Sequence, residues 1–221
     1  MTSRGPGKQV RKSAAERRRE IVAEGARIGL EEGLECLTRQ RVADGLGVQA
    51  GLIHHYFPVI EELVAEAFTS ATTGELDGLL PEADTTAGKP DADDPLSALQ
   101  RFFTLISGTE FDNISKLWLN ARHLSRYRPV LHDQVVSQEL RWCHRIEQTI
   151  AQGVQAGKFR CADPWGAAVR ILAVIDGAGA YINTSADQRT EPLADLARTL
   201  AEAELGLPSG GLKQRPGRPP E

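Results

Sequence analysis

The apolar residues of this chain recur at helical spacing from Ala14 onward, and this periodicity restricts the fold more than any other feature of the sequence. Gly33 stands where a C-cap would close the first helix, and Asp94-Pro95 and Asp163-Pro164 are cap-and-proline pairs that open later helices. No segment shows the sustained alternation of apolar and polar residues that is typical of a half-buried strand. The sequence therefore predicts an all-α fold.

The 221 residues include 41% hydrophobic and 25% charged side chains, which is ordinary for a soluble globular protein. No continuous apolar run approaches roughly 18 residues, and no apolar stretch follows the charged N-terminus, so we expect neither a membrane span nor a secretory signal. The three cysteines are odd in number and far apart, which favours reduced thiols in the cytoplasm over a disulfide framework. They are Cys36, Cys143 and Cys161.

Positive charge is concentrated near the N-terminus. Residues 1–19 hold seven basic side chains and one acid, which gives +6, so in a chain of net charge −4 the other residues carry −10. A basic arm on an acidic protein indicates contact with a polyanion at that end. A solvated, disordered tail explains the same charges, and charge alone does not decide between these interpretations.

Composition and helix signals divide the chain into expected regions. A basic disordered arm over 1–13 precedes a helix-turn-helix domain over 14–57 and a helical regulatory and dimerisation domain over 58–205. An acidic loop rich in glycine, proline and aspartate is expected over 74–95 within the latter domain. Residues 206–221 are rich in glycine, proline and charge, which indicates a disordered tail.

Two short helices joined by a tight turn are expected between Thr38 and Phe57, with Thr38 as the N-cap of the first and Tyr56 near the end of the second. This is the layout of a helix-turn-helix, in which one helix enters the major groove and the other braces it. Pro58 is expected to be the first residue of the fourth helix. The shared core of the motif is expected to consist of Val42, Leu46, Val48, Ile53 and Phe57.

A set of residues between Arg18 and Phe68 follows a known spacing, namely Ile21, Ala26, Gly33, Thr38, Val42-Ala43, Leu46-Gly47-Val48, Gly51, Tyr56-Phe57 and Glu62-Leu63. With these residues the segment resembles the N-terminal domain of the TetR family of bacterial repressors, without a gap. The stretch from Gly51 to Pro58 resembles that family's reading helix and the residues that follow it. The resemblance implies a three-helix DNA-binding domain that binds double-stranded operator DNA.

The resemblance also implies which positions contact DNA. Two positions at the start of the second helix approach base edges or adjacent phosphates, namely Arg39 and Gln40. The third helix with its N-cap supplies the others, namely Gln49, Ala50, Gly51, Leu52, His54, His55 and Tyr56. Among them His54 and Tyr56 occupy places that usually contact phosphates. Arginine and glutamine can hydrogen-bond to bases or phosphates, whereas alanine and leucine can only pack against a thymine methyl.

Three residues depart from the family pattern. Gln49 stands where the family usually has a serine-type cap, so this cap is expected to be weaker. His54 replaces a usual tyrosine, and Ile60 replaces a usual lysine that would contact a phosphate. These departures leave the fold and the role intact and put the strength of DNA binding in question.

Three stretches of the later chain, Leu117 to Arg122, Gly153 to Phe159 and Ile175 to Gly177, carry a looser resemblance. With them, residues 117–181 resemble the ligand-sensing region of the subgroup that contains the choline–betaine repressor. This implies that the last two helices form a four-helix homodimer interface, in which the small residues from Gly177 to Ala180 permit close approach. Leu193, Leu196 and Leu200 would add apolar area. The alternative interpretation is the core of a single-chain bundle.

An effector pocket is expected among the central helices, and Arg122 with His123 would be its polar pair if the ligand is anionic. Most aromatic residues at helical spacing are simply core, which is the competing interpretation of each aromatic candidate. The candidate ligand-binding residues are Phe102, Phe103, Trp118, Arg122, His123, Tyr127, Trp142 and Asp176.

Other chemistries lack a pattern in this sequence. The histidines and Cys143 do not fall at metal-ligand spacing, and no catalytic or phosphate-binding motif occurs, so we expect no metal, no cofactor and no enzyme. The tail from Arg215 to Pro219 has a faint likeness to a minor-groove hook, although a plain disordered tail explains it better.

These observations predict a homodimeric transcriptional regulator, most simply a repressor that a small-molecule effector releases from its operator. Two alternatives stay open. One is a helical interaction protein that has lost DNA binding, which the absence of a lysine at Ile60 favours. The other is a helical bundle that binds or converts a small molecule.

Overall fold

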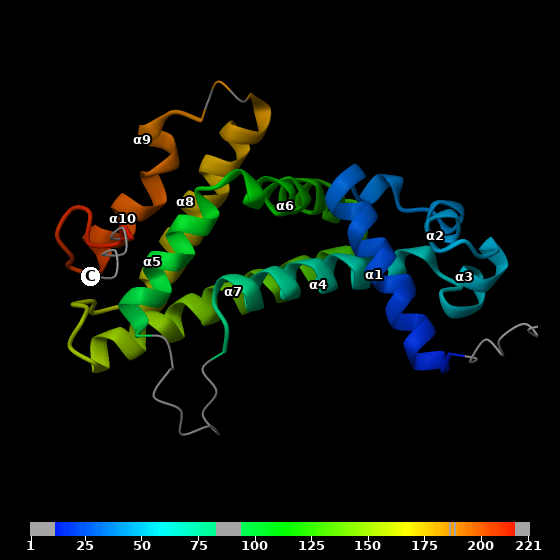
Figure 1. Ribbon diagram of the computed structural model, residues 1–221, viewed down its shortest axis with the longest axis horizontal. Helices are drawn as coiled ribbons and strands as arrows, with labels where there is room; N and C mark the ends of the chain where they lie inside the picture. The colour runs from blue at the N-terminus through cyan, green and yellow to red at the C-terminus, as the bar shows by residue number, and fades with distance from the viewer. Residues whose placement is uncertain (1–11, 83–93, 186, 188, 215–221) are drawn as a thin grey trace, which may run out of the picture.

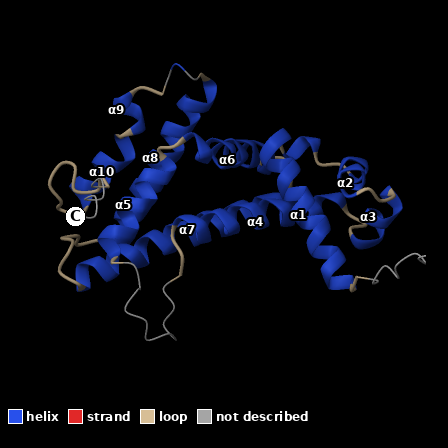
Figure 2. Cartoon of the chain, in the orientation of Figure 1, coloured by secondary structure: helices blue, strands red, loops and turns tan. Residues whose placement is uncertain are grey.

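The computed structural model describes residues 12–82, 94–185, 187 and 189–214. These residues form helices and turns, with no strand among them (Figure 2), so the all-α prediction is confirmed. The helices are α1 (Ala14–Glu32), η1 (Leu34–Cys36), α2 (Arg39–Leu46), α3 (Ala50–Tyr56), α4 (Ile60–Leu79), α5 (Pro95–Ile106), η2 (Thr109–Phe111), α6 (Asp112–Ser125), α7 (Pro129–Gln155), α8 (Pro164–Thr184), α9 (Glu191–Ala194) and α10 (Leu196–Glu204).

The molecule is elongated, with α2 and α3 at one end and α8 to α10 at the other (Figure 1). The long helices α4 and α7 pack against each other between the two ends, and α1 packs across α4. Helix α6 contacts α1, α7 and α8, so it connects the end formed by α1 to α3 with the end formed by α8 to α10. Most of the expected arm over 1–13 and the tail from Arg215 to Pro219 lie outside the described residues.

Helix α4 corrects two expectations. It begins at Ile60 with Val59 as N-cap, so Pro58 precedes the helix and is not its first residue. It continues to Leu79, although an acidic loop was expected from residue 74. The reason is packing: Leu76 is fully buried and Leu79 nearly so, and this burial outweighs the low helix propensity of the two glycines in the last turns. Residues 83–93 of the expected loop lie outside the described residues.

The C-terminal region is divided into the one-turn α9 and the longer α10, and it corrects one more expectation. The expected tail begins too early at 206, because Leu212 is fully buried in the core. The buried Glu202 carboxylate accepts the backbone N–H groups of Gly210 and Leu212 at 2.9 and 3.0 Å, which folds this segment back onto α10.

The centre of the molecule is an aromatic core. The rings of Trp118 and Phe68 meet edge to face at 5.0 Å, and those of Trp118 and Trp142 at 6.2 Å. The indole N–H of Trp142 donates to the Thr72 carbonyl at 3.3 Å, so its polar atom is satisfied although the side chain is 1% exposed. This cluster ties α4, α6 and α7 together.

Helix α8 is, within the described part of the chain, the one helix whose length and mean hydropathy of 1.3 would allow it to cross a membrane. It nevertheless packs against α6, α7 and α10. Its Arg170 and Asp176 are held in ion pairs with Glu204 and Arg122. Helix α8 therefore packs as part of the helical bundle and leaves one face uncovered.

Candidate DNA interface and ligand cavity

The α2–α3 pair is fixed by local signals in its own sequence. The Thr38 hydroxyl accepts the Arg41 backbone N–H at 3.1 Å and caps α2. Gly47 ends α2 at a φ of 64°, a left-handed conformation that glycine adopts without strain, and this makes the tight turn. Val42, Ile53 and Phe57 are fully buried, while Leu46 and Val48 are partly buried against the same core, as predicted.

The predicted DNA-contacting residues divide into two groups. Five are exposed, namely Gln40, Gln49, Gly51, His54 and His55. Four are half-buried, namely Arg39, Ala50, Leu52 and Tyr56. Gln49 is the N-cap of α3 and makes no side-chain capping hydrogen bond, which agrees with the weak cap expected at this position. The exposed surface of α3 therefore offers amide and imidazole groups for base or phosphate contacts.

Gln40 and His55 lie on the exposed surface of α2 and α3, and each is expected to contribute to base recognition. Gln40→Ala and His55→Ala should each weaken binding to the preferred duplex by about 1–3 kcal/mol and relax the preference at one base pair. Gln148→Ala, an exposed glutamine on α7, is the matched control and should change neither. The check is a selection from random duplexes followed by affinity measurement. An unchanged consensus and affinity would show that another face reads the DNA.

Ile60 is the first residue of α4 and is half-buried against the core. Ile60→Lys is expected to tighten DNA binding for all sequences alike, because backbone N–H groups in a first helical turn already attract anions. One added phosphate contact should steepen the salt dependence of log Kd by about one unit. The measurement is a salt titration, with a thermal melt to report lost packing. An unchanged salt slope in a folded variant would place residue 60 away from the phosphates.

The predicted ligand-binding residues lie in different surroundings. Four of them are buried side chains of the core, namely Phe102, Phe103, Trp118 and Trp142. His123 and Tyr127 contact each other at the C-terminal end of α6, where Tyr127 is 75% exposed. The aromatic residues follow helical spacing because they fill the interior, so the competing core interpretation describes the buried four better.

Arg122 lies in a cluster with two carboxylates. Its guanidinium donates to Glu139 at 2.8 Å and to Asp176 at 2.7 Å and lies 4.8 Å from the centre of the Trp118 ring. Burial raises the pKa of Asp176, and the charge of Arg122 partly opposes this shift. An anionic ligand at Arg122 would have to displace these two carboxylates.

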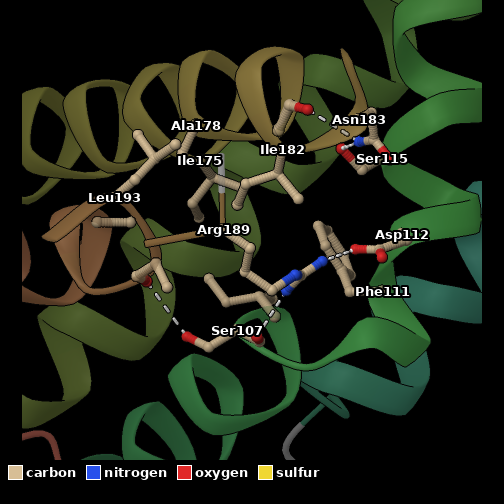
Figure 3. Close-up of a pocket in the computed structure, with 14 residues that line it drawn as sticks. Ser107, Phe111, Asp112, Ser115, Ile175, Ala178, Ile182, Asn183, Arg189 and Leu193 are labelled. Atoms are coloured by element: carbon tan, nitrogen blue, oxygen red, sulfur yellow. Dashed lines mark hydrogen bonds and ion pairs between the residues drawn. The ribbon is translucent and has the colours of Figure 1, made fainter. Parts of the chain in front are cut away.

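A hollow that the sequence did not predict lies between the ends of α5 and α6, the second half of α8, and α9 with α10 (Figure 3). With its side chains in place it has a free volume of about 30 Å³, room for little more than a water molecule, and it is partly open to solvent. Its lining is mostly apolar, with Ile175 and Ile182 contributed by α8 and Phe111 by η2. None of the predicted ligand residues lines it.

The polar groups of this hollow are concentrated around one arginine. Arg189, which precedes α9, reaches across the hollow, donates to the Ser107 carbonyl at 2.9 Å and pairs with the Asp112 carboxylate (Figure 3). The Asn183 amide donates to the Ser115 hydroxyl at 2.9 Å. An apolar lining with one ion pair suits a small ligand that has an apolar body and a charged group, once the Arg189 side chain has moved out of the hollow. Within the described residues, no three histidine, cysteine or acidic side chains gather as metal ligands would.

One face of α8 is uncovered. Trp165, Val169, Ala173, Gly177 and Tyr181 recur at every fourth position and are all exposed. At one end of the stripe, the Trp165 ring lies 4.9 Å from the imidazole of His144 on α7. A stripe of this length and composition on an exposed helix is typical of a protein–protein contact.

The two glycines of the run from Gly177 to Ala180 face different surroundings. A side chain at Gly177 would meet no atom within 4 Å, whereas one at Gly179 would collide with the Ser115 hydroxyl. Gly177 therefore permits another helix to approach α8 closely from the solvent side, and Gly179 permits close packing of α8 on α6.

Comparison with known proteins supplies the context for these surfaces. A family model described as the C-terminal domain of the BetI-type transcriptional repressors matches residues 95–206. A putative transcriptional regulator from Saccharomonospora viridis, solved in complex with choline, is 26% identical, with a TM-score of 0.65 over 83% of this chain and 96% of that one. A search of the curated proteins found no match.

Other solved structures share the fold. A TetR transcription regulator from Haloarcula marismortui is 22% identical, with a TM-score of 0.68 over 87% of this chain and 97% of that one. The transcriptional regulator FadR from Bacillus subtilis, solved with stearoyl-CoA, is 18% identical, with a TM-score of 0.59 over 85% of this chain and 97% of that one. Each likeness covers more than four fifths of this chain, so it extends into α1 to α3, the head of the molecule, as well as over the C-terminal helices.

Proposed function

Because this chain belongs to the TetR family of transcriptional regulators and has a C-terminal domain of the BetI type, we propose that it represses transcription by binding an operator as a homodimer. The observation that carries the proposal is the exposed surface of α3, which presents Gln49, His54 and His55 at one end of the molecule. We assign DNA binding to residues 14–57 and regulation and dimerisation to residues 60–214.

The uncovered stripe of α8 is the surface that we assign to the dimer contact. In a two-fold dimer, Gly177 of one protomer would meet the same face of its partner, and its missing side chain permits close helix approach. The two heads would then contact half-sites about one helical turn, or 34–36 Å, apart. An effector would release the operator by disturbing the alignment of the two heads with successive major grooves.

The hollow around Arg189 is the proposed effector site. The relative from Saccharomonospora viridis was solved with choline, and a small cation of this kind would suit Asp112. Its ammonium group would take the place of the Arg189 guanidinium, and Phe111 and Ile175 would contact its methyl groups. A ligand that binds one arrangement of the hollow better than another shifts the population toward the first.

Helix α6 connects this hollow to the head. Asp112 and Ser115 in its first turns line the hollow, while the Asn120 side chain accepts the backbone N–H of Leu34 at 2.8 Å. Leu34 begins the short η1 between α1 and α2. A displacement of α6 by a ligand at Asp112 would therefore reach the head through a direct hydrogen bond.

Two measurements test this proposal. A gel shift with the DNA upstream of the chain's own gene should give a complex that excess random duplex does not remove. Choline should then dissociate the complex, whereas its neutral isostere 3,3-dimethylbutanol should not, and Asp112→Asn should abolish the response. A specific complex that ignores choline would contradict the effector assignment alone.

A helical interaction protein that has lost DNA binding is the second candidate. Two positions that could offer a positive charge to a phosphate do not do so, which favours this candidate. Residue 60 is an isoleucine packed on the core, and the guanidinium of Arg39 is bound within the protein. Failure of the full chain to bind any duplex selected from a random pool would support this candidate over repression.

A further inference from the structure

We propose that Arg39 is a positioning residue, which holds the reading helix α3 by binding the chain that leaves it, and that it does not contact a DNA phosphate. The proposal rests on the proposed function, since α3 is taken as the helix that enters the major groove. It departs from the expectation that Arg39, at the start of α2, approaches bases or phosphates.

The guanidinium of Arg39 donates two hydrogen bonds to the segment between α3 and α4. Its Nε lies 3.4 Å from the carbonyl oxygen of Phe57, and its Nη2 donates to the carbonyl oxygen of Pro58. The side chain is half-buried, so its planar fork faces the protein on the side where these carbonyls lie. Two donors on one rigid group fix both the distance and the angle between the start of α2 and the end of α3.

These carbonyls gain a partner that their own helices do not supply. Phe57 is the C-cap of α3, and its carbonyl lies beyond the last turn of that helix. The following helix α4 begins at Ile60, and its N-cap Val59 makes no side-chain capping hydrogen bond. Arg39 therefore supplies the hydrogen bonds to these two carbonyls from 18 and 19 residues away.

A second arginine holds the same segment from α1. The guanidinium of Arg18 lies 4.7 Å from the centre of the Phe57 ring and pairs with Glu66 on α4. Hydrogen bonding to Glu66 raises the pKa of Arg18. Phe57 is thus bound at its ring from α1 and at its carbonyl from α2. These two side chains set the direction in which the chain leaves α3 toward α4.

The two possible roles of Arg39 predict different salt dependence. Loss of a phosphate contact removes counterion release and lowers the slope of log Kd against log salt by about 0.9. Loss of a positioning contact lets α3 move within the head, which weakens binding without altering the number of phosphates neutralised. We therefore expect Arg39→Ala to weaken binding about tenfold at an unchanged salt slope.

The experiment uses the full chain and the duplex that the wild type selects. Affinity is measured by fluorescence anisotropy across a series of KCl concentrations for Arg39→Ala, Arg39→Lys and the control Arg41→Ala. The control removes the same charge two residues along α2, where Arg41 pairs with Glu32, and should leave affinity nearly unchanged. Lysine lacks the fork and should not restore binding. Full affinity in Arg39→Lys, or a lower slope in Arg39→Ala, would overturn the proposal.

Hydrogen exchange of the free chain separates this role from general stability and from the function itself. Arg39→Ala should speed exchange of the α3 amides while those of α1 and α4 keep their wild-type rates. Equal acceleration in all three helices, or no change in α3, would contradict a positioning role. If the wild type binds no duplex, the proposed function fails, yet exchange in the free chain still decides whether Arg39 holds α3.

Discussion

Val169→Arg is expected to convert the dimer to a monomer and to weaken operator binding by at least about a hundredfold. Val169 is 40% exposed and is the second of the five residues of the α8 stripe, so a guanidinium there would be buried without a counter-ion in an apolar contact. Each head alone binds one half-site, and the gain from linking two heads is on the order of 10²–10⁴ in affinity. Loss of the dimer removes this gain.

Val130→Arg provides the matched control, because Val130 is a valine of 43% exposure on α7, beside the groove between α1, α4 and α7. It should stay dimeric and bind the operator normally. Light scattering gives the mass of each variant, and anisotropy gives its affinity. A dimeric Val169→Arg with wild-type affinity would show that α8 is not the dimer contact.

Trp142→Ala is expected to lower the free energy of unfolding by about 3–5 kcal/mol, because it removes a fully buried indole and leaves a cavity. Trp142 contacts the Trp118 ring and donates to the Thr72 carbonyl, so three helices lose packing together. For a chain of this size the melting temperature should fall by about 10 °C. Denaturant unfolding measures the change directly.

Trp142→Phe is the companion variant. It keeps an aromatic ring and loses the indole N–H, and it should cost only about 1–2 kcal/mol. Both variants should keep the wild-type affinity for choline where they remain folded, since Trp142 does not line the hollow. A stable Trp142→Ala that no longer responds to an effector would instead favour the sequence-based assignment of Trp142 to the pocket.

Local signals explain why much of the fold could be predicted from the sequence. The caps at Thr38, Asp94 and Asp163 and the left-handed Gly47 act within a few residues, and each marks a helix end that the structure has. The end of α4 and the folding of residues 206–214 depend on burial of Leu79 and Leu212 against distant helices. Sequence spacing carries no information on such contacts.

The same distinction applies to the functional surfaces. The exposed side of α3 follows from the helix-turn-helix layout, so Gln49, His54 and His55 could be identified from the sequence. The partners of Arg39 lie 18 and 19 residues further along the chain, and a pattern of residue types does not reveal which way its guanidinium turns. The hollow around Arg189 joins five helices, and only their packing places Asp112 beside it.

The specificity ratio of the full chain tests the central claim most directly. Anisotropy at physiological salt gives Kd for the selected duplex and for a scrambled duplex of the same length and composition. A dimeric repressor that reads DNA through α3 predicts a ratio of at least about 10³. A ratio near one would mean that the chain binds only the phosphate backbone and would contradict the account.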